Sequence, residues 1–147
     1  MKRFLLMTPL LWGLYACSGP SGPIRQSFAD SCWPQADTLA TTWTPGTTGD
    51  HTLQVYATYQ PDYRFQNIHF RVELIPPTGP ARVFIVADTL MDARGVWEEE
   101  GFQSTSAPIR FDVAENGLHT LRLSHYMRTD DLCEIRGVTL LKPVPVQ

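Results

Sequence analysis

The sequence has no tract rich in lysine or arginine, and only 18% of its 147 residues are charged. The formal net charge is -3. A protein whose main task is to neutralise nucleic-acid phosphates needs the opposite balance, so nucleic acid is excluded as the expected partner. Long hydrophobic runs are absent too. The apolar stretch from Phe4 to Ala16 is shorter than the roughly 20 residues that a membrane-spanning helix requires.

Catalytic and metal-binding signatures are also missing. The sequence contains no Gly-x-Ser-x-Gly elbow, no phosphate-binding glycine loop and no Cys/His nucleophile pair. Its four histidines are scattered, and none stands at a spacing typical of zinc ligands: His51, His69, His119 and His125. We therefore expect no enzyme, no metal and no cofactor. We expect the histidines to pack within the sheets. The alternative is a site that histidines from distant strands form together.

The first residues have the features of a targeting segment. Lys2 and Arg3 precede the apolar stretch, which ends in Leu14-Tyr15-Ala16-Cys17. This ending resembles the lipobox of bacterial lipoproteins, which implies cleavage before Cys17 and acylation of its thiol and new amino terminus. Two or more acyl chains give durable attachment to a membrane. We predict a signal peptide over residues 1–16 and a lipid on Cys17; the alternative is an ordinary cleaved secretory signal.

The remaining chain divides into three parts. Residues 17–26 include Ser18-Gly19-Pro20-Ser21-Gly22-Pro23, a composition typical of a flexible tether. Residues 27–142 are long enough for one hydrophobic core, and residues 143–147 are expected to form a loose tail. We predict one domain on a lipidated tether, and we expect it to bind no small-molecule ligand.

Cysteine is scarce, with only three in the chain. If Cys17 carries lipid, Cys32 and Cys133 remain in an oxidising compartment. We predict a disulfide between them, which would join the first ordered segment to the last strands. The alternative is that each is an independent small apolar residue.

Alternation of apolar and polar residues predicts β-strands along most of the chain. Leu53 to Tyr59 and Ile68 to Leu74 each have one apolar face, whereas residues 81–90 are apolar on both faces, as expected of a central strand. Further strands are expected at 38–43 on an edge, and at 109–113, 118–126 and 134–141. About six to eight antiparallel strands indicate an all-β protein, a β-sandwich that could have jelly-roll connections.

Several stretches resemble the GldH family of gliding-motility lipoproteins of the Bacteroidetes. They run from the lipobox to about residue 142: Tyr63-Arg64-Phe65-Gln66-Asn67-Ile68, Asp88-Thr89-Leu90, Gly95-Val96-Trp97, Gly101-Phe102, Tyr126-Met127-Arg128, Leu132, Ile135 and Gly137-Val138. The family pattern has glycines where this chain has Glu98-Glu99-Glu100, and glycine at Cys133 or Glu134. The resemblance implies a non-catalytic envelope lipoprotein that interacts with other proteins of the gliding and protein-secretion apparatus. Surface-displayed lipoproteins of these bacteria often carry an acidic cluster after the lipidated cysteine. No such cluster follows Cys17, so we expect an outer-membrane protein that faces the periplasm.

Three residues are candidates for contact with a partner protein: Trp97, Phe102 and Arg128. Aromatic side chains are frequent hot spots of protein interfaces. For Arg128, an ion pair with Asp130 and Asp131 is the first expectation, ahead of a ligand clamp. The alternative function is a carbohydrate-binding module, in which exposed aromatic rings stack on sugars: Trp43, Trp97, Tyr56, Tyr59 and Tyr63. Exposed rings on a concave sheet would favour this alternative, and buried tryptophans would favour a protein partner.

Overall fold

The computed structural model describes residues 23–97 and 102–147. The predicted signal peptide, the lipidation site Cys17 and the acidic run Glu98-Glu99-Glu100 lie outside the described residues. All regular structure in the described part is β. Among these residues there is no helix with the length and hydrophobicity needed to cross a membrane.

Each predicted segment forms a strand, but the structure adds short strands that were not predicted, and the first of them, Ile24–Ser27, overlaps the predicted tether at residues 17–26. The strands are β1 (Ile24–Ser27), β2 (Cys32–Pro34), β3 (Leu39–Trp43), β4 (Gly49–Leu53), β5 (Val55–Tyr59), β6 (Asn67–Ile75), β7 (Arg82–Thr89), β8 (Gln103–Thr105), β9 (Ile109–Val113), β10 (His119–His125), β11 (Asp131–Cys133), β12 (Ile135–Leu140) and β13 (Val144–Pro145). Every pairing between them is antiparallel.

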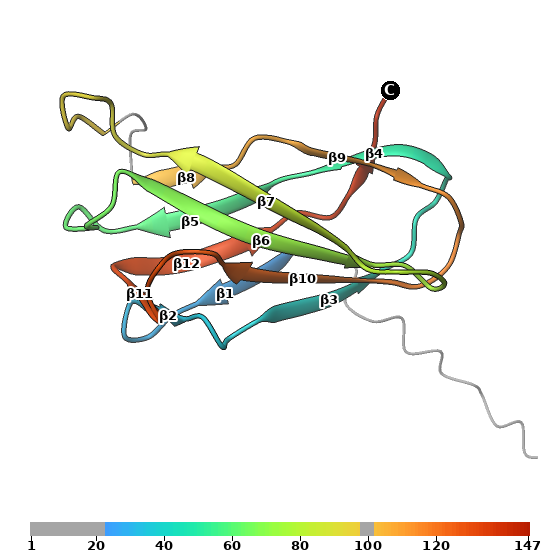
Figure 1. Cartoon of the computed structure of the whole chain (residues 1–147), viewed down its shortest axis with the longest axis horizontal. Coiled ribbons are helices and arrows are strands. Elements are labelled where there is room, and N and C mark those ends of the chain that lie inside the picture. Colours follow the sequence, from blue (N-terminus) through green and yellow to red (C-terminus); the bar gives the residue numbers. More distant parts are fainter. Residues whose placement is uncertain (1–22, 98–101) are drawn as a thin grey trace, which may run out of the picture.

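Two four-stranded sheets form a sandwich (Figure 1). One has the order β1-β12-β5-β8 and the other the order β3-β10-β6-β7, which we call the β6 sheet. A three-stranded sheet, β13-β4-β9, continues the first sheet because β4 runs into β5, β8 into β9 and β12 into β13. The strand pairs are nested within one another along the chain: β1 pairs with β12, β3 with β10, β4 with β9, β5 with β8, and β6 with β7. This nesting is the jelly-roll arrangement.

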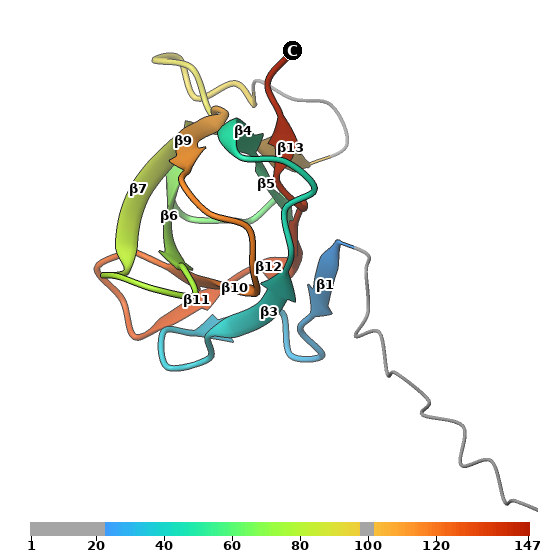
Figure 2. The same ribbon diagram turned by 90° about the vertical axis from the view of Figure 1, so that its right-hand side faces the viewer.

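The core lies between the two sheets, which Figure 2 shows as opposite walls. In β6, side chains at alternating positions from Ile68 to Leu74 are buried, while His69, Arg71 and Glu73 face outward. The inward faces of β5, β9 and β10 contribute apolar side chains in the same way. The predicted alternation and the predicted β-sandwich are therefore confirmed.

One strand occupies a different place from the one predicted. Residues 81–90 were expected in the middle of a sheet, but β7 is the edge strand of the β6 sheet. Phe84 and Val86 pack against the core, whereas Val83 and Ile85 are 47% and 46% exposed. A run that is apolar on both faces does not reveal whether its second face is covered, since that depends on the packing of the whole sandwich.

Both ends of the domain are paired with neighbouring strands. β1 begins at Ile24, directly after the Gly/Pro-rich segment, and lies so close to β12 that a Cβ atom on Gly137 would be 2.7 Å from the carbonyl oxygen of Gln26. The last residues, expected to be a loose tail, include β13, which pairs with β4. The backbone N–H of Val146 also donates to the carbonyl of Asp50 at 2.9 Å.

Candidate functional site

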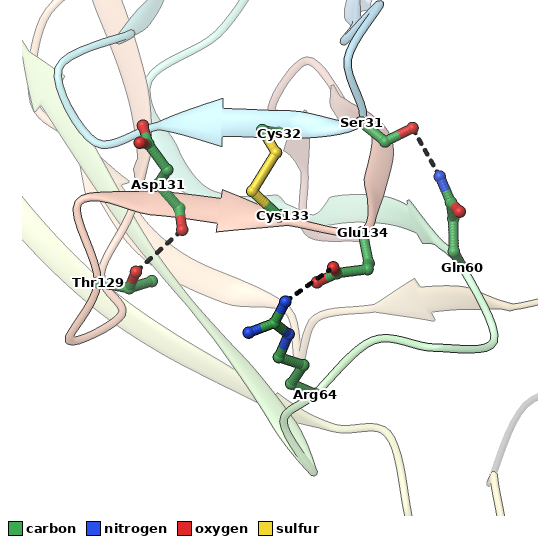
Figure 3. Close-up of a disulfide and its surroundings, with 8 residues drawn as sticks. All are labelled: Ser31, Cys32, Gln60, Arg64, Thr129, Asp131, Cys133 and Glu134. Carbon is green, nitrogen blue, oxygen red and sulfur yellow. Dashed lines mark hydrogen bonds and ion pairs between the residues drawn. A yellow bond between two sulfur atoms is a disulfide. The ribbon is translucent and has the colours of Figure 1, made fainter.

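The short strands β2 and β11 lie at one end of the sandwich and carry a disulfide (Figure 3). Cys32 stands directly opposite Cys133 in this ladder, and the two sulfur atoms are bonded, as predicted. The bond connects residues 101 positions apart in the sequence. It therefore holds the start of the domain against the segment that follows β10.

Glu134, next to the disulfide, has a backbone conformation that favours glycine. Its φ angle is +62°, in the left-handed region. Its carboxylate is 3.7 Å from the guanidinium of Arg64, and the Gln60 amide donates to the hydroxyl of Ser31 at 2.6 Å (Figure 3). Burial, and in second place the charge of Glu134, raises the pKa of Tyr63 well above its ordinary value. Tyr63 is therefore a neutral hydrogen-bond donor, and its hydroxyl donates to the carbonyl of Asn67 at 3.1 Å.

Trp97 and Phe102, two of the predicted partner-binding residues, come together on the core residue Tyr59. The ring centroid of Tyr59 is 5.1 Å from that of Trp97 and 5.8 Å from that of Phe102, and the last two are 5.7 Å apart. Both side chains are half-buried. Their rings thus extend the core, and their contact with a partner stays a prediction.

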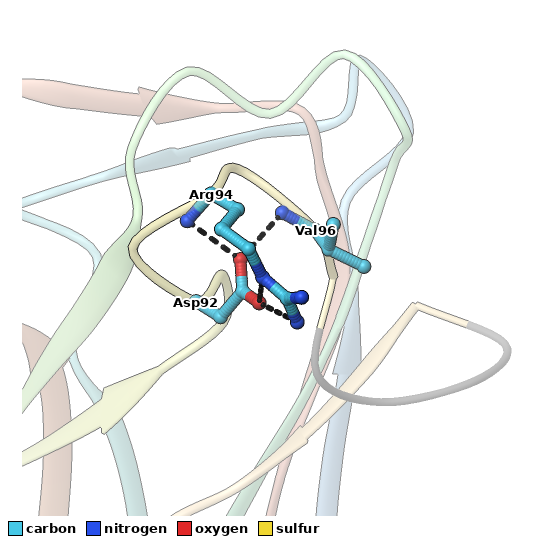
Figure 4. Close-up of polar contacts among 3 residues, drawn as sticks. All are labelled: Asp92, Arg94 and Val96. Atoms are coloured by element: carbon cyan, nitrogen blue, oxygen red, sulfur yellow. Dashed lines mark hydrogen bonds and ion pairs between the residues drawn. The ribbon is translucent and has the colours of Figure 1, made fainter.

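A compact turn before Trp97 sets its position (Figure 4). The Asp92 carboxylate accepts the backbone N–H groups of Val96 and Arg94 at 3.0 and 2.8 Å, and it accepts the Arg94 guanidinium at 2.7 Å. These hydrogen bonds, first that from Val96, lower the pKa of Asp92. Gly95 has a φ of +78° in this turn, which glycine adopts without steric cost.

Arg128, the third predicted residue, lies in a different place, at a groove of about 700 Å³. The groove is formed where β6 begins and β10 ends, and its lining residues are Phe65, Asn67, His69, Tyr126, Met127 and Arg128. Two stretches that resemble the GldH family, one near residue 65 and one near residue 127, therefore meet there. Phe65 is 37% exposed and Tyr126 is 55% exposed, so two aromatic rings are open to solvent.

Local backbone geometry explains why Tyr126 and Arg128 face this groove. The N–H of Tyr126 donates to the carbonyl of His69 at 2.8 Å, which extends the β10–β6 ladder by one residue. The chain then leaves the sheet, and the sulfur of Met127 accepts the N–H of His69 at 3.3 Å. The loop after Met127 is held at its far end by β11 and the disulfide. Arg128 is thus presented from a loop that is fixed at both ends.

Arg128 brings a positive charge to this groove, on a chain whose net charge is negative. Among the described residues, no carboxylate lies within ion-pair distance of the exposed Arg128, so the predicted pair with Asp130 or Asp131 is not formed. Farther along the same sheet face, Glu73 is shared between Arg71 and Arg122 at 3.7 and 3.6 Å. The free guanidinium therefore suits an acidic or hydrogen-bond-accepting group on a partner.

Sequence reasoning identified Arg128 but not the other groove residues as a site. Phe65, Asn67 and Tyr126 lie in the stretches that resemble the family, yet about 60 residues separate those stretches in the sequence. Only the β6–β10 pairing brings them together. β6 and β10 are not consecutive strands, so no turn joins them and fixes which of their residues face one another.

His125 lies beneath the end of β10 and is 1% exposed. Its ring contacts Trp33 edge-on at a centroid distance of 5.4 Å, and its Nδ1 accepts the N–H of Met127 at 3.4 Å. Burial lowers the pKa of His125; backbone groups of Asp130 and Trp33 and the charge of Asp131 oppose this effect. The ring is therefore neutral at physiological pH and supports the turn that carries Arg128.

The lowered pKa of His125 predicts a pH-dependent stability. In the unfolded chain the ring has its ordinary pKa of 6.5, so below that pH the unfolded state binds a proton more readily than the folded state. Stability is fully present above about pH 6.5 and falls as the pH decreases, with a slope of at most about 1.4 kcal/mol per pH unit from this group. We expect urea denaturation between pH 7.5 and 5.5 to show a smaller loss for His125→Gln than for the unchanged protein. Equal losses in the two proteins would contradict this assignment.

The other candidate chemistry is not assembled in the described part of the chain. Within residues 23–97 and 102–147, no three His, Cys, Asp or Glu side chains are placed to hold a metal ion. Of the aromatic residues considered for sugar stacking, three are buried, namely Trp43, Tyr59 and Tyr63, and two are half-buried, namely Tyr56 and Trp97. They form no exposed platform, which by the criterion given above favours a protein partner.

Fold and groove together define a small disulfide-linked jelly-roll domain that presents an aromatic and arginine-lined groove on one sheet. The sequence profile of the family described as GldH lipoprotein matches residues 24–140 of this chain, which covers the whole sandwich. The chain belongs to the GldH lipoprotein family. No curated protein is similar enough in sequence to match it.

Proposed function

We propose that this protein is a non-catalytic interaction component of the gliding and protein-secretion apparatus, held in the cell envelope by a lipid on Cys17. Membership of the GldH lipoprotein family supports membrane association and a role of the gliding-motility type, and that family is not known for enzymatic activity. The lipobox-like sequence before Cys17 supports the anchor. The absence of acidic residues in the segment after Cys17 supports an outer-membrane protein that faces the periplasm.

The groove at Phe65, Tyr126 and Arg128 is the observation that carries the proposed docking role. It combines two exposed rings with a guanidinium that has no carboxylate partner among the described residues. Aromatic residues and arginine are the side chains that contribute most to protein interfaces. The groove is on the β6 sheet, whereas β1, which begins seven residues after Cys17, is in the other sheet. The tether therefore enters the sheet opposite the groove, and its seven residues reach at most about 25 Å.

Reversing the charge of the groove tests this proposal. We expect Arg128→Glu, introduced at the native locus, to reduce crosslinking to gliding or secretion components by about tenfold or more, because a central interface residue is worth at least about 2 kcal/mol. Secreted proteins and cell movement are measured in parallel. Arg110→Glu is the matched control, since Arg110 is also exposed, lies on β9 and does not line the groove.

Two further measurements separate loss of docking from loss of location. Arg128→Glu must still fractionate with membranes, whereas Cys17→Ser is expected to release the protein into the soluble fraction. If Arg128→Glu and Arg110→Glu leave crosslinking and secretion equally unchanged, the groove is not the docking site. If Cys17→Ser leaves the protein in the membrane fraction, the proposed anchor is wrong.

A carbohydrate ligand is the second candidate, favoured by one observation. The exposed rings of Phe65 and Tyr126 flank polar groups of Asn67 and Arg128 in the same groove, and aromatic rings beside hydrogen-bonding groups can hold a sugar. Retention of the purified protein on a polysaccharide resin, abolished by Tyr126→Ala, would support this candidate. Elution in the void volume would remove it.

A further inference from the structure

The open edge of the β6 sheet is formed by β7, a strand of eight residues. β7 pairs with β6 along its whole length, and no described strand pairs with its other side. The N–H of Leu90 donates to the carbonyl of Gln66, in register with the ladder. Even-numbered residues of β7 therefore bond to β6, and the odd-numbered residues from Val83 to Thr89 direct their N–H and C=O groups outward.

The central part of this edge, from Val83 to Ala87, lacks the usual features that prevent pairing with another strand. Proteins generally protect such edges with lysine, proline, a bulge or a very short strand. In β7 four side chains point to the solvent-facing side of the sheet, namely Val83, Ile85, Ala87 and Thr89. The first two are nearly half exposed. The charged residues of the strand, Arg82 and Asp88, lie near its two ends with half-buried side chains on the inner face. A second strand could thus add to β7 without burying an uncompensated charge at its centre.

We propose that a second copy of this chain occupies the edge, with β7 pairing to β7 about a two-fold axis through Ile85. The strand is self-complementary in that register. Val83 of each copy stands opposite Ala87 of the other, and Phe84 stands opposite Val86. Arg82 stands opposite Asp88 at both ends, so that each dimer gains two cross-strand pairs of opposite charge.

Neighbouring registers lose this complementarity. A two-fold axis at Val86 would place Asp88 opposite Phe84, and an axis at Phe84 would place Arg82 opposite Val86. A shift by a single residue would set inward side chains against outward ones. Only the register centred on Ile85 matches hydrogen bonds, faces and charges together.

Two details of the side chains agree with the charge pairs. The Oδ2 atom of Asp88 is buried and has no hydrogen-bond partner among the described residues. Arg82 donates through Nη2 to the carbonyl of Asp112 at 2.6 Å, which leaves other N–H groups of its guanidinium available. The second copy would therefore supply a partner for an acceptor that the described part of a single chain leaves unsatisfied.

The expected association is weak in solution and stronger on a membrane. One added strand pair buries less surface than a standard stable interface. Two chains anchored in one bilayer have a raised effective concentration. A two-fold axis perpendicular to the sheet keeps the sheets that contain β1 on the same side, so both anchors can reach one membrane. This step uses the proposed anchor on Cys17, but the pairing itself depends on neither the anchor nor the groove.

A cysteine crosslink tests the register in the mature lipidated chain, reconstituted in vesicles. Opposed residues of a hydrogen-bonded antiparallel pair have Cα atoms about 5.5 Å apart, which fits a disulfide. We expect Ile85→Cys to give a covalent dimer on mild oxidation. Ala40→Cys, on the opposite edge strand β3, is the matched control and should stay monomeric. Val83→Cys should crosslink efficiently only when it is mixed with Ala87→Cys.

Charge reversal gives a second, non-covalent test by sedimentation in detergent. We expect Asp88→Arg to weaken the dimer about tenfold, because both charge pairs become repulsive, and Arg82→Asp with Asp88→Arg to restore it. Circular dichroism confirms that each variant is folded. The proposal is overturned if Ile85→Cys forms no dimer or if Ala40→Cys crosslinks as fast. Either of these results would leave the groove proposal intact.

Discussion

Removal of the Cys32–Cys133 disulfide is expected to lower the free energy of unfolding by about 4 kcal/mol. The bond closes a loop of 101 residues, and a loop of that size restricts the unfolded chain strongly. Urea denaturation of the double variant Cys32→Ala, Cys133→Ala, beside the unchanged protein, measures the difference. The protein is small, so a loss of this size is a large part of its stability.

Reduction supplies the control for this prediction. Dithiothreitol should destabilise the unchanged protein by a similar amount and have no effect on the double variant. A loss below about 1 kcal/mol would mean that the strands β2 and β11 hold the two ends together without the covalent bond. The disulfide would then serve a different purpose from stabilisation.

Trp33→Ala is expected to cost about 4 kcal/mol, the range for deleting a fully buried aromatic side chain. Trp33 is completely buried, stacks on Phe28 at 5.5 Å and contacts Phe70 at 6.5 Å. Its Nε1–H donates to the carbonyl of Asp37 at 2.8 Å, and the variant leaves that carbonyl without this donor. Thermal or urea denaturation gives the measurement.

The matched control is Trp97→Ala, which removes the same side chain from a half-buried position. It should cost clearly less, because part of its surface already contacts water. A loss at Trp97 equal to that at Trp33 would show that the cluster of Trp97, Phe102 and Tyr59 contributes to stability as strongly as the centre of the core.

Much of the fold could be predicted because alternation is a local property. The apolar face of Ile68 to Leu74 follows from side chains that point to opposite sides along a strand, and it is the buried face in the structure. The disulfide followed from counting thiols in an oxidising compartment. The segment around Val83 and Ile85 was misplaced because its composition is the same for a covered strand and an exposed edge.

The candidate site was predictable only in part. Arg128 was identified by its place after a strand, but its partners in the groove come from β6 and from the loop before it. Trp97 and Phe102 were named as candidates for contact with a partner protein, and that contact stays a prediction. In the structure both rings contact Tyr59, and the turn at Asp92 directly precedes Trp97.

The amino-acid sequence alone determined that this chain is β-structured, that Cys32 and Cys133 pair, and that the segment ending at Cys17 has the pattern of a lipoprotein signal. Each of these depends on residue type and short-range spacing. Tertiary structure alone decided that Phe65 and Tyr126 share a groove with Arg128 and that β7 lies at an open edge. Both depend on which strands pair, and that choice is made by the burial of the whole core at once, so no single segment records it.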